Sequence, residues 1–175
     1  MLNQILTNTP RWVWGLLLAL LWLGLSQAVA RSASLRRVTL MPLAMTGLSL
    51  YGTVSAFGAD AQLLLVWLGA CALTAALVLQ QALPEATRYD AATRRFFLPG
   101  SWAPLLLILG IFATKYGVGV ATALQPALRH ELGFALGVAA LYGAFSGVLA
   151  ARAARLWRLA LRQGEVASGR LPRTA

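Results

Sequence analysis

The stretch AQLLLVWLGACALTAALVLQQA, residues 61–82, decides the fold class of this chain. It contains no acidic and no basic side chain. A helix needs about 20 predominantly apolar residues, at about 1.5 Å of rise each, to cross the hydrocarbon core of a bilayer. A water-exposed surface cannot be built from an uncharged run of this length. The segment therefore predicts a membrane-spanning helix.

Four further apolar runs predict an all-α, polytopic bundle of five transmembrane helices. The expected helices cover residues 12–30, 38–57, 61–82, 102–124 and 133–154. The whole chain, residues 1–175, is predicted to form a single membrane domain with a basic helical tail at 155–164 and a disordered end at 165–175. Signal-peptide cleavage after Ala30 is an alternative for the first run, but no basic residue precedes position 11, as a signal peptide normally requires.

The distribution of charge predicts the orientation of the bundle. Fifteen Lys and Arg residues stand against 5 Asp and Glu, which gives a formal net charge of +10. The first and third loops and the tail carry twelve of the 14 arginines, and the segments on the opposite side carry two. The positive-inside rule places the arginine-rich side in the cytoplasm, with the N-terminus outside and the C-terminus inside. We expect a bacterial cytoplasmic (inner) membrane protein, and no nucleic-acid partner because the basic residues lie between apolar runs.

Basic clusters beside the predicted helix ends indicate contacts with membrane lipids. A basic residue close to an anionic leaflet contributes about 1 kcal/mol to binding. The arginines expected to contact anionic headgroups on the cytoplasmic side are Arg94, Arg95, Arg152, Arg155, Arg158 and Arg162.

The last predicted span carries a stripe of small residues at alternating spacings of four and three. It comprises Gly133, Gly137, Ala140, Ala144 and Gly147. Small side chains let two helix backbones approach closely in a membrane. The stripe predicts packing against another helix of the same chain, with a homodimer interface as the alternative.

Lys115 is the charged side chain placed deepest in a predicted span. A lysine near the bilayer centre costs about 2.5–3.5 kcal/mol on insertion scales, and such residues mark functional sites by default. None of the five acidic residues falls in a span. Three interpretations stay open: a structural lysine that snorkels or is neutral, an anchor for an anionic or polar ligand in a cavity, and a neutral-amine nucleophile.

Polar residues on neighbouring spans are candidates to line such a cavity. The candidate ligand-binding residues are Lys115, Tyr116, Thr46, Ser49, Tyr142 and Tyr51. The favoured function is binding or translocation of a small anionic or polar ligand around Lys115. The alternative is a non-catalytic accessory or assembly subunit that interacts through the small-residue stripe.

The sequence offers little else for chemistry. Cys71 is the single cysteine and His130 the single histidine, so neither a disulfide within the chain nor a convincing metal cluster is expected. No phosphate-binding glycine loop or nucleophile-elbow motif is present. We expect no cofactor and no metal, and catalysis is the least favoured class.

Three segments together resemble a known family. They are ILTNTPRWVWGLLLALLWLG (5–24), LSLYGTVSAFG (48–58) and LPGSWAPLLLILGIFATKYGVGV (98–120). They resemble small integral membrane proteins that are widespread in proteobacteria and are classed as a domain of unknown function. The resemblance covers essentially the whole chain, implies a membrane location, and places Lys115 and Tyr116 in a family pattern. It implies no activity.

Overall fold

The computed structural model describes residues 10–84, 86–90, 93 and 95–167, and this part of the chain is mostly helical. Its elements are the helices α2 (Arg11–Leu25), α3 (Leu35–Phe57), α4 (Ala61–Gln80), α5 (Ala103–Leu124) and α6 (Leu132–Ala167), with the 3-10 helix η1 (Pro126–His130) before α6. The helices α3, α4, α5 and α6 are long and apolar enough to cross a membrane. The predicted basic tail is part of α6, which continues without a break past the predicted span.

The first helix is shorter than predicted. Helix α2 has 15 residues, a length of about 22 Å at about 1.5 Å per residue, which is less than a hydrocarbon core of about 30 Å. After Leu25 the chain turns, with backbone N–H donation from Gln27 to Gly24 and from Ala28 to Leu25. A methyl group at Gly100 would overlap the carbonyl of Ala28, so the two loops touch directly here. The expected helix from 12 to 30 is therefore wrong in its last five residues.

A small antiparallel sheet caps one end of the bundle, so the all-α expectation is also wrong. Its strands are β1 (Arg31–Ser34), β2 (Arg88–Asp90) and β3 (Arg95–Leu98), in the order β1–β3–β2. Phe96 of β3 pairs with Ala33 of β1 and with Tyr89 of β2. Phe96 is fully buried, and its ring lies 4.8 Å from the ring of Tyr89 between centroids. The pairing satisfies backbone groups of two loops that are far apart in the sequence.

The predicted disordered end begins too early. The backbone of residues 165–167 belongs to α6, and the rest of that segment lies outside the described residues.

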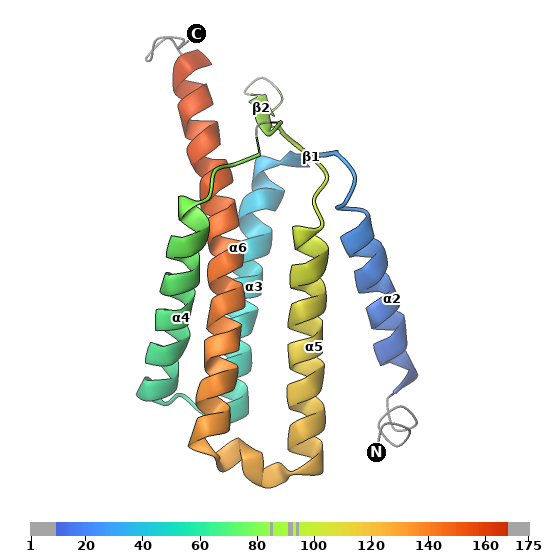
Figure 1. Cartoon of the computed structure of the whole chain (residues 1–175), viewed down its shortest axis with the longest axis vertical. Helices are drawn as coiled ribbons and strands as arrows, with labels where there is room; N and C mark the ends of the chain where they lie inside the picture. Colours follow the sequence, from blue (N-terminus) through green and yellow to red (C-terminus); the bar gives the residue numbers. More distant parts are fainter. Residues whose placement is uncertain (1–9, 85, 91–92, 94, 168–175) are drawn as a thin grey trace.

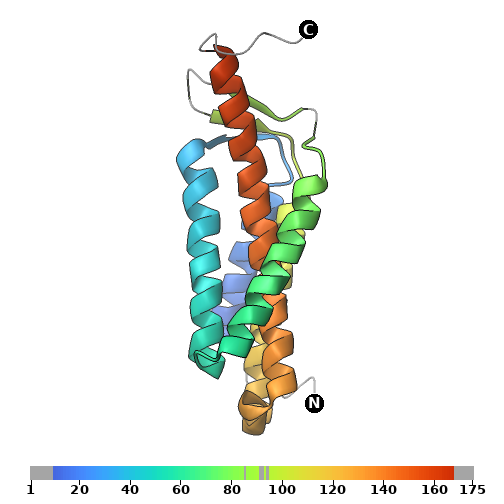
Figure 2. The same cartoon turned by 90° about the vertical axis from the view of Figure 1, so that its left-hand side faces the viewer.

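Helix α6 is the central element of a closely packed group with α3 and α4. Figure 2 shows α6 running between these two helices. Leu63 and Trp67 of α4 pack against Ala135, Val138 and Ala139 of α6. This group forms one layer of the structure, and we call it the packed layer.

Helices α2 and α5 form a second, thinner layer. Helix α2 packs on α5, while α5 contacts α6 at only a few positions. Figure 1 shows this pair on one side of the bundle, and we call it the α2–α5 pair. The sheet and η1 join it to the packed layer at opposite ends.

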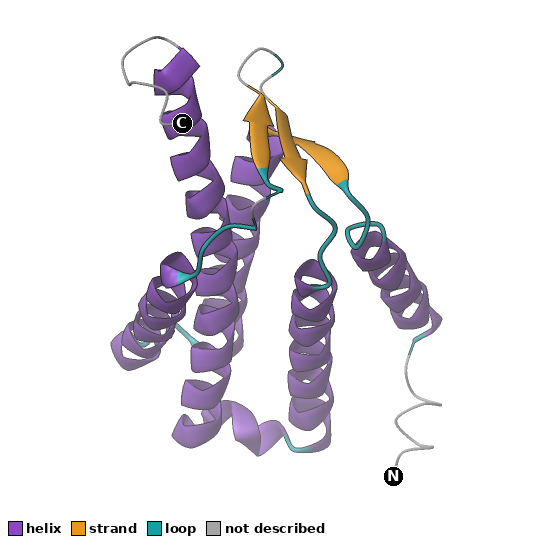
Figure 3. Ribbon diagram, turned by 45° about the horizontal axis from the view of Figure 1, so that its top comes forward, coloured by secondary structure: helices purple, strands orange, loops and turns teal. Residues whose placement is uncertain are grey.

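The arginine-rich segments gather at one end of the structure. Figure 3 shows all three strands at the same end as the C-terminal half of α6. The N-terminal end of α2 and η1 lie at the opposite end. The loop charges predict that the first loop, the third loop and the tail share one side, and the structure places these segments at one end.

Candidate ligand-binding groove

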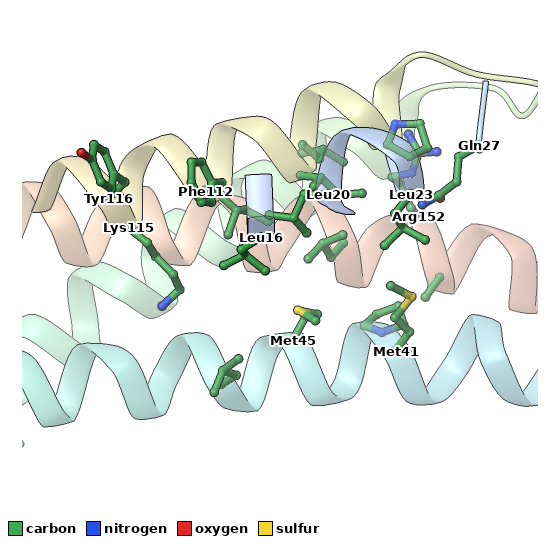
Figure 4. Close-up of a pocket in the computed structure, with 18 of the residues that line it drawn as sticks. Leu16, Leu20, Leu23, Gln27, Met41, Met45, Phe112, Lys115, Tyr116 and Arg152 are labelled. Atoms are coloured by element: carbon green, nitrogen blue, oxygen red, sulfur yellow. The ribbon is translucent and has the colours of Figure 1, made fainter. Parts of the chain in front are cut away.

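Lys115 reaches from α5 toward the packed layer. Figure 4 shows its side chain extending between α5 and α3. The ammonium nitrogen lies 4.7 Å from the ring centroid of Tyr142 on α6. On α3, a Cβ atom at Gly52 would lie 3.2 Å from the same nitrogen. The electron-rich ring face is a favourable neighbour for the cation, and the missing side chain of Gly52 leaves room for it.

The backbone carbonyl of Tyr142 takes part in a hydrogen-bond network between helices. The hydroxyls of Ser49 and Ser146 both donate to the Tyr142 carbonyl, at 3.1 and 2.8 Å. The indole N–H of Trp67 donates to the Ser49 hydroxyl at 3.3 Å. Side chains of α3, α4 and α6 therefore meet at the backbone of Tyr142, the residue against whose ring Lys115 lies.

A large cavity separates the two layers. Its volume is about 1000 Å³, and its walls come from α2, α3, α5 and α6. The labelled apolar side chains in Figure 4 are Leu16, Leu20, Leu23, Met41, Met45 and Phe112. Ligand pockets in proteins typically measure about 300–1,000 Å³, so this space, which we call the groove, is at the upper end of that range.

Lys115 lies in one part of the groove and a group of arginines in another. Gln27, Arg31, Arg37 and Arg152 line the arginine end, and Figure 4 shows Gln27 and Arg152 together, well apart from Lys115. The Arg31 guanidinium donates to the Gln27 side-chain oxygen at 2.7 Å. Burial, together with the nearby charge of Arg37, lowers the pKa of Arg31 from its ordinary value. The arrangement is a long apolar space with concentrated positive charge at one end.

A family match covers almost the whole chain. The match covers residues 1–166 and is to a family of unknown function, DUF6622. The chain belongs to the DUF6622 family. This confirms the resemblance to a domain of unknown function that the sequence indicates. No curated protein and no solved structure matches the chain.

The structure of this DUF6622 protein places only two of the six candidate ligand-binding residues on the groove. Lys115 and Tyr116 line it, and in Figure 4 their side chains point in different directions. The Tyr116 ring stacks on Phe112 with 6.0 Å between centroids and 5° between planes. Tyr142 supports Lys115 from α6 without lining the groove itself. The ligand-binding role of these residues stays a prediction.

The other three candidates lie elsewhere. Ser49 is engaged between α3, α4 and α6, so its hydroxyl serves helix packing. Thr46 is half-buried on α3 but does not line the groove. Tyr51 is 69% exposed and does not line the groove. Helical spacing alone places Thr46 and Ser49 on one face but does not show which neighbour that face meets.

The small-residue stripe has two different environments. Gly147 abuts α4 so closely that a methyl group there would overlap the Cys71 carbonyl and the Thr74 hydroxyl. Thr74 also donates to the Ala144 carbonyl at 3.0 Å. Added Cβ atoms at Gly133 and Gly137 would meet nothing within 4 Å. Packing within the chain thus uses the Ala144–Gly147 part of the stripe, and Ala140 between the two parts is half-buried.

The arginines expected to contact lipid headgroups have different environments in the structure. Arg155 donates to the Ala82 carbonyl at the end of α4, which ties α6 to the following loop. Arg95, Arg158 and Arg162 are exposed, and their contact with headgroups stays a prediction, while Arg94 lies outside the described residues. Arg152 turns inward to the groove.

Sequence reasoning missed the arginine end of the groove. Arg31 and Arg37 follow the first apolar run and read as orientation signals only. Nothing in the local sequence places them beside Arg152, which is more than 100 residues away. The one usable signal is that all three arginines belong to segments predicted to share a side of the membrane.

Proposed function

We propose that this DUF6622 protein binds an amphiphilic molecule in the groove between the packed layer and the α2–α5 pair. The observation that carries the proposal is the groove itself, a space of about 1000 Å³ with mainly apolar walls inside a bundle of membrane-length helices. Apolar walls with a few polar groups are the usual composition of a ligand site. The site is larger and less polar than a cavity centred on Lys115 alone.

The bundle is proposed to sit in a bacterial cytoplasmic membrane with the sheet on the cytoplasmic side. The arginine-rich loops and the C-terminal half of α6 share that end of the structure. The positive-inside rule favours this orientation. In it, the ligand lies alongside the lipid chains, with its polar part toward the cytoplasmic leaflet.

Lys115 is proposed to contact the ligand deeper in the membrane. It is level with Tyr142, and ten residues of α6 separate Tyr142 from Arg152, which is about 15 Å along a helix axis. An ammonium group at this depth is costly when it has no partner. The Tyr142 ring face offsets part of that cost, and a polar group on the ligand offsets more.

The proposal is tested by filling the groove. Gly119 and Gly117 lie two residues apart on α5, and an added Cβ atom at either would meet nothing within 4 Å. Gly119 lines the groove and Gly117 does not. Gly119→Leu should therefore fill the groove, while Gly117→Leu is a matched control with the same change in helix propensity.

The readout is photo-crosslinking in vesicles with a neutral 16-carbon alcohol that carries a diazirine on its chain. We expect labelling of the groove wall at Ile108 and Ile111 to exceed labelling of Leu106, which is 68% exposed on α5. Gly119→Leu should remove the excess and Gly117→Leu should leave it. Equal labelling of groove and outer surface in the wild-type protein would contradict the proposal.

A further inference from the structure

The arginine end of the groove brings together side chains from three separate elements. Arg31 comes from β1, Arg37 from the first turn of α3 and Arg152 from α6. Arg152 is within electrostatic reach of Arg31, and Arg31 is within reach of Arg37. The tertiary fold therefore concentrates three positive charges on one side of a single cavity.

In the described part of the chain, no carboxylate is found close enough to Arg31 or Arg152 to compensate their charge. Arg31 is bonded to the neutral amide of Gln27. Among the described residues, no hydrogen-bond or ion-pair partner is found for the guanidinium groups of Arg37 and Arg152.

Of the described acids, Asp60 and Glu131 lie next to α4 and α6 at the other end of the bundle. Asp90 lies in β2 of the sheet, accepts a hydrogen bond from the Thr93 hydroxyl, and does not line the groove. Arg31 and Arg152 are half-buried and Arg37 is exposed. The mutual repulsion of two half-buried like charges is unfavourable, and an anion bound between the arginines would offset it.

We propose that Arg31, Arg37 and Arg152 bind the phosphate head of a membrane lipid whose acyl chain occupies the groove. This inference rests on the proposed function and adds the class of ligand. Guanidinium groups present planar pairs of N–H donors that match phosphate oxygens, and three of them can surround one head. The groove supplies the apolar surface for the chain, and Lys115 lies along it.

The sheet sets a limit on the size of the head. Ala33 of β1 and Leu98 of β3 line the same cavity, and Figure 3 shows the three strands at this end of the bundle. Strands that cover the arginine end leave room for a compact phosphate and less for a large substituent on it. The ligand is therefore a lipid with a simple phosphate head, in preference to a phosphocholine lipid.

The test compares three amphiphiles with the same 12-carbon chain on the full-length protein in nanodiscs of zwitterionic lipid. The probes are dodecyl phosphate, dodecylphosphocholine and dodecanol, with inorganic phosphate as a fourth. Binding is measured as a dissociation constant from ligand-dependent thermal stabilisation. We expect dodecyl phosphate to bind about tenfold or more tightly than either other amphiphile, because charge-assisted hydrogen bonds reach about 1.5–3 kcal/mol.

Two arginine variants on α6 locate the effect. Arg152→Gln should weaken dodecyl phosphate about tenfold and leave dodecanol unchanged, and retained dodecanol binding shows that the variant is folded. Arg158→Gln is the matched control, since Arg158 is exposed on the same helix and does not line the groove. Arg31→Lys keeps the charge but not the planar fork, and should also weaken dodecyl phosphate.

The outcomes separate this inference from the function on which it rests. Equal binding of all three amphiphiles, lost in Gly119→Leu, overturns the phosphate head and supports the groove. Tighter binding of dodecylphosphocholine overturns the limit on head size. Inorganic phosphate binding as tightly as dodecyl phosphate overturns a lipid as the ligand. Binding of none of the probes, or binding that Gly119→Leu does not change, overturns the proposed function and this inference with it.

Discussion

The packed layer and the α2–α5 pair belong to one chain but are built differently. In the packed layer, glycines bring α4 and α6 into backbone contact, and hydroxyls such as those of Thr53 and Ser146 are completely or almost completely buried. The α2–α5 pair has long leucine and tryptophan side chains, and several are more than 60% exposed, including Trp12, Leu18 and Trp22. The packed layer is therefore the more closely joined of the two regions, and the α2–α5 pair forms one wall of the groove.

Substitution of a glycine that lies in backbone contact within the packed layer should have the largest effect on stability. Gly147→Leu places a side chain where α4 already has the Cys71 carbonyl and the Thr74 hydroxyl. Overpacking costs typically about 1–3 kcal/mol and more where backbone must move, so we expect at least about 3 kcal/mol of destabilisation. Reversible unfolding in mixed micelles with increasing SDS measures it.

Gly137→Leu is the control on the same stripe. Nothing lies within 4 Å of the Cβ position at Gly137, so the variant should unfold as the wild type does. If Gly137→Leu instead destabilises the protein, or converts a dimer to a monomer, this part of the stripe contacts a second chain and the homodimer alternative gains support.

Loss of one bridging hydroxyl should have a smaller effect. Ser49 accepts from Trp67 and donates to the Tyr142 carbonyl, so Ser49→Ala removes two hydrogen bonds between helices. Such bonds average about 0.6 kcal/mol each in membranes, which predicts a loss of about 1 kcal/mol in the same unfolding assay. Ser55→Ala is the comparison, because Ser55 bonds only to the Gly52 carbonyl of its own helix. Equal effects of the two changes would show that Ser49 does not join the helices.

Most of the packed layer could be predicted from sequence, and the groove could not. Hydropathy locates the spans of α3, α4, α5 and α6 to within a few residues. Each spanning helix makes its backbone hydrogen bonds within itself, so its length and apolarity are enough to identify it. The spacing of Ala144 and Gly147 predicts close contact with another helix, since small residues lie on a single helix face, and the structure shows that this helix is α4.

The features that were missed depend on which segments meet. The pairing of Ala33 with Phe96 joins loops more than 60 residues apart, and strands of three or four residues carry a weak pattern. The groove lies where α5 contacts α6 at only a few positions. Strand β1 follows α2 in the chain and β3 precedes α5, so the sheet links these two helices. Hydropathy places Arg152 and Arg37 near the ends of predicted spans, but does not show that they line one cavity.

Lys115 tests the boundary between the two regions, because it extends from α5 to Gly52 and Tyr142 in the packed layer. Lys115→Met keeps the length of the side chain and removes its charge. The variant loses a cation–π contact of about 0.5–2 kcal/mol. It also no longer bears the cost of placing a lysine in the membrane, about 2.5–3.5 kcal/mol. The unfolding free energy should therefore be higher, by about 0.5–3 kcal/mol. A ligand that contacts Lys115 should lose part of its thermal stabilisation in this variant, while Lys115→Arg should retain more of it. A Met variant that is clearly less stable but binds dodecyl phosphate as the wild type does would assign Lys115 to the packed layer as a structural residue, and would leave the arginine end as the polar part of the groove.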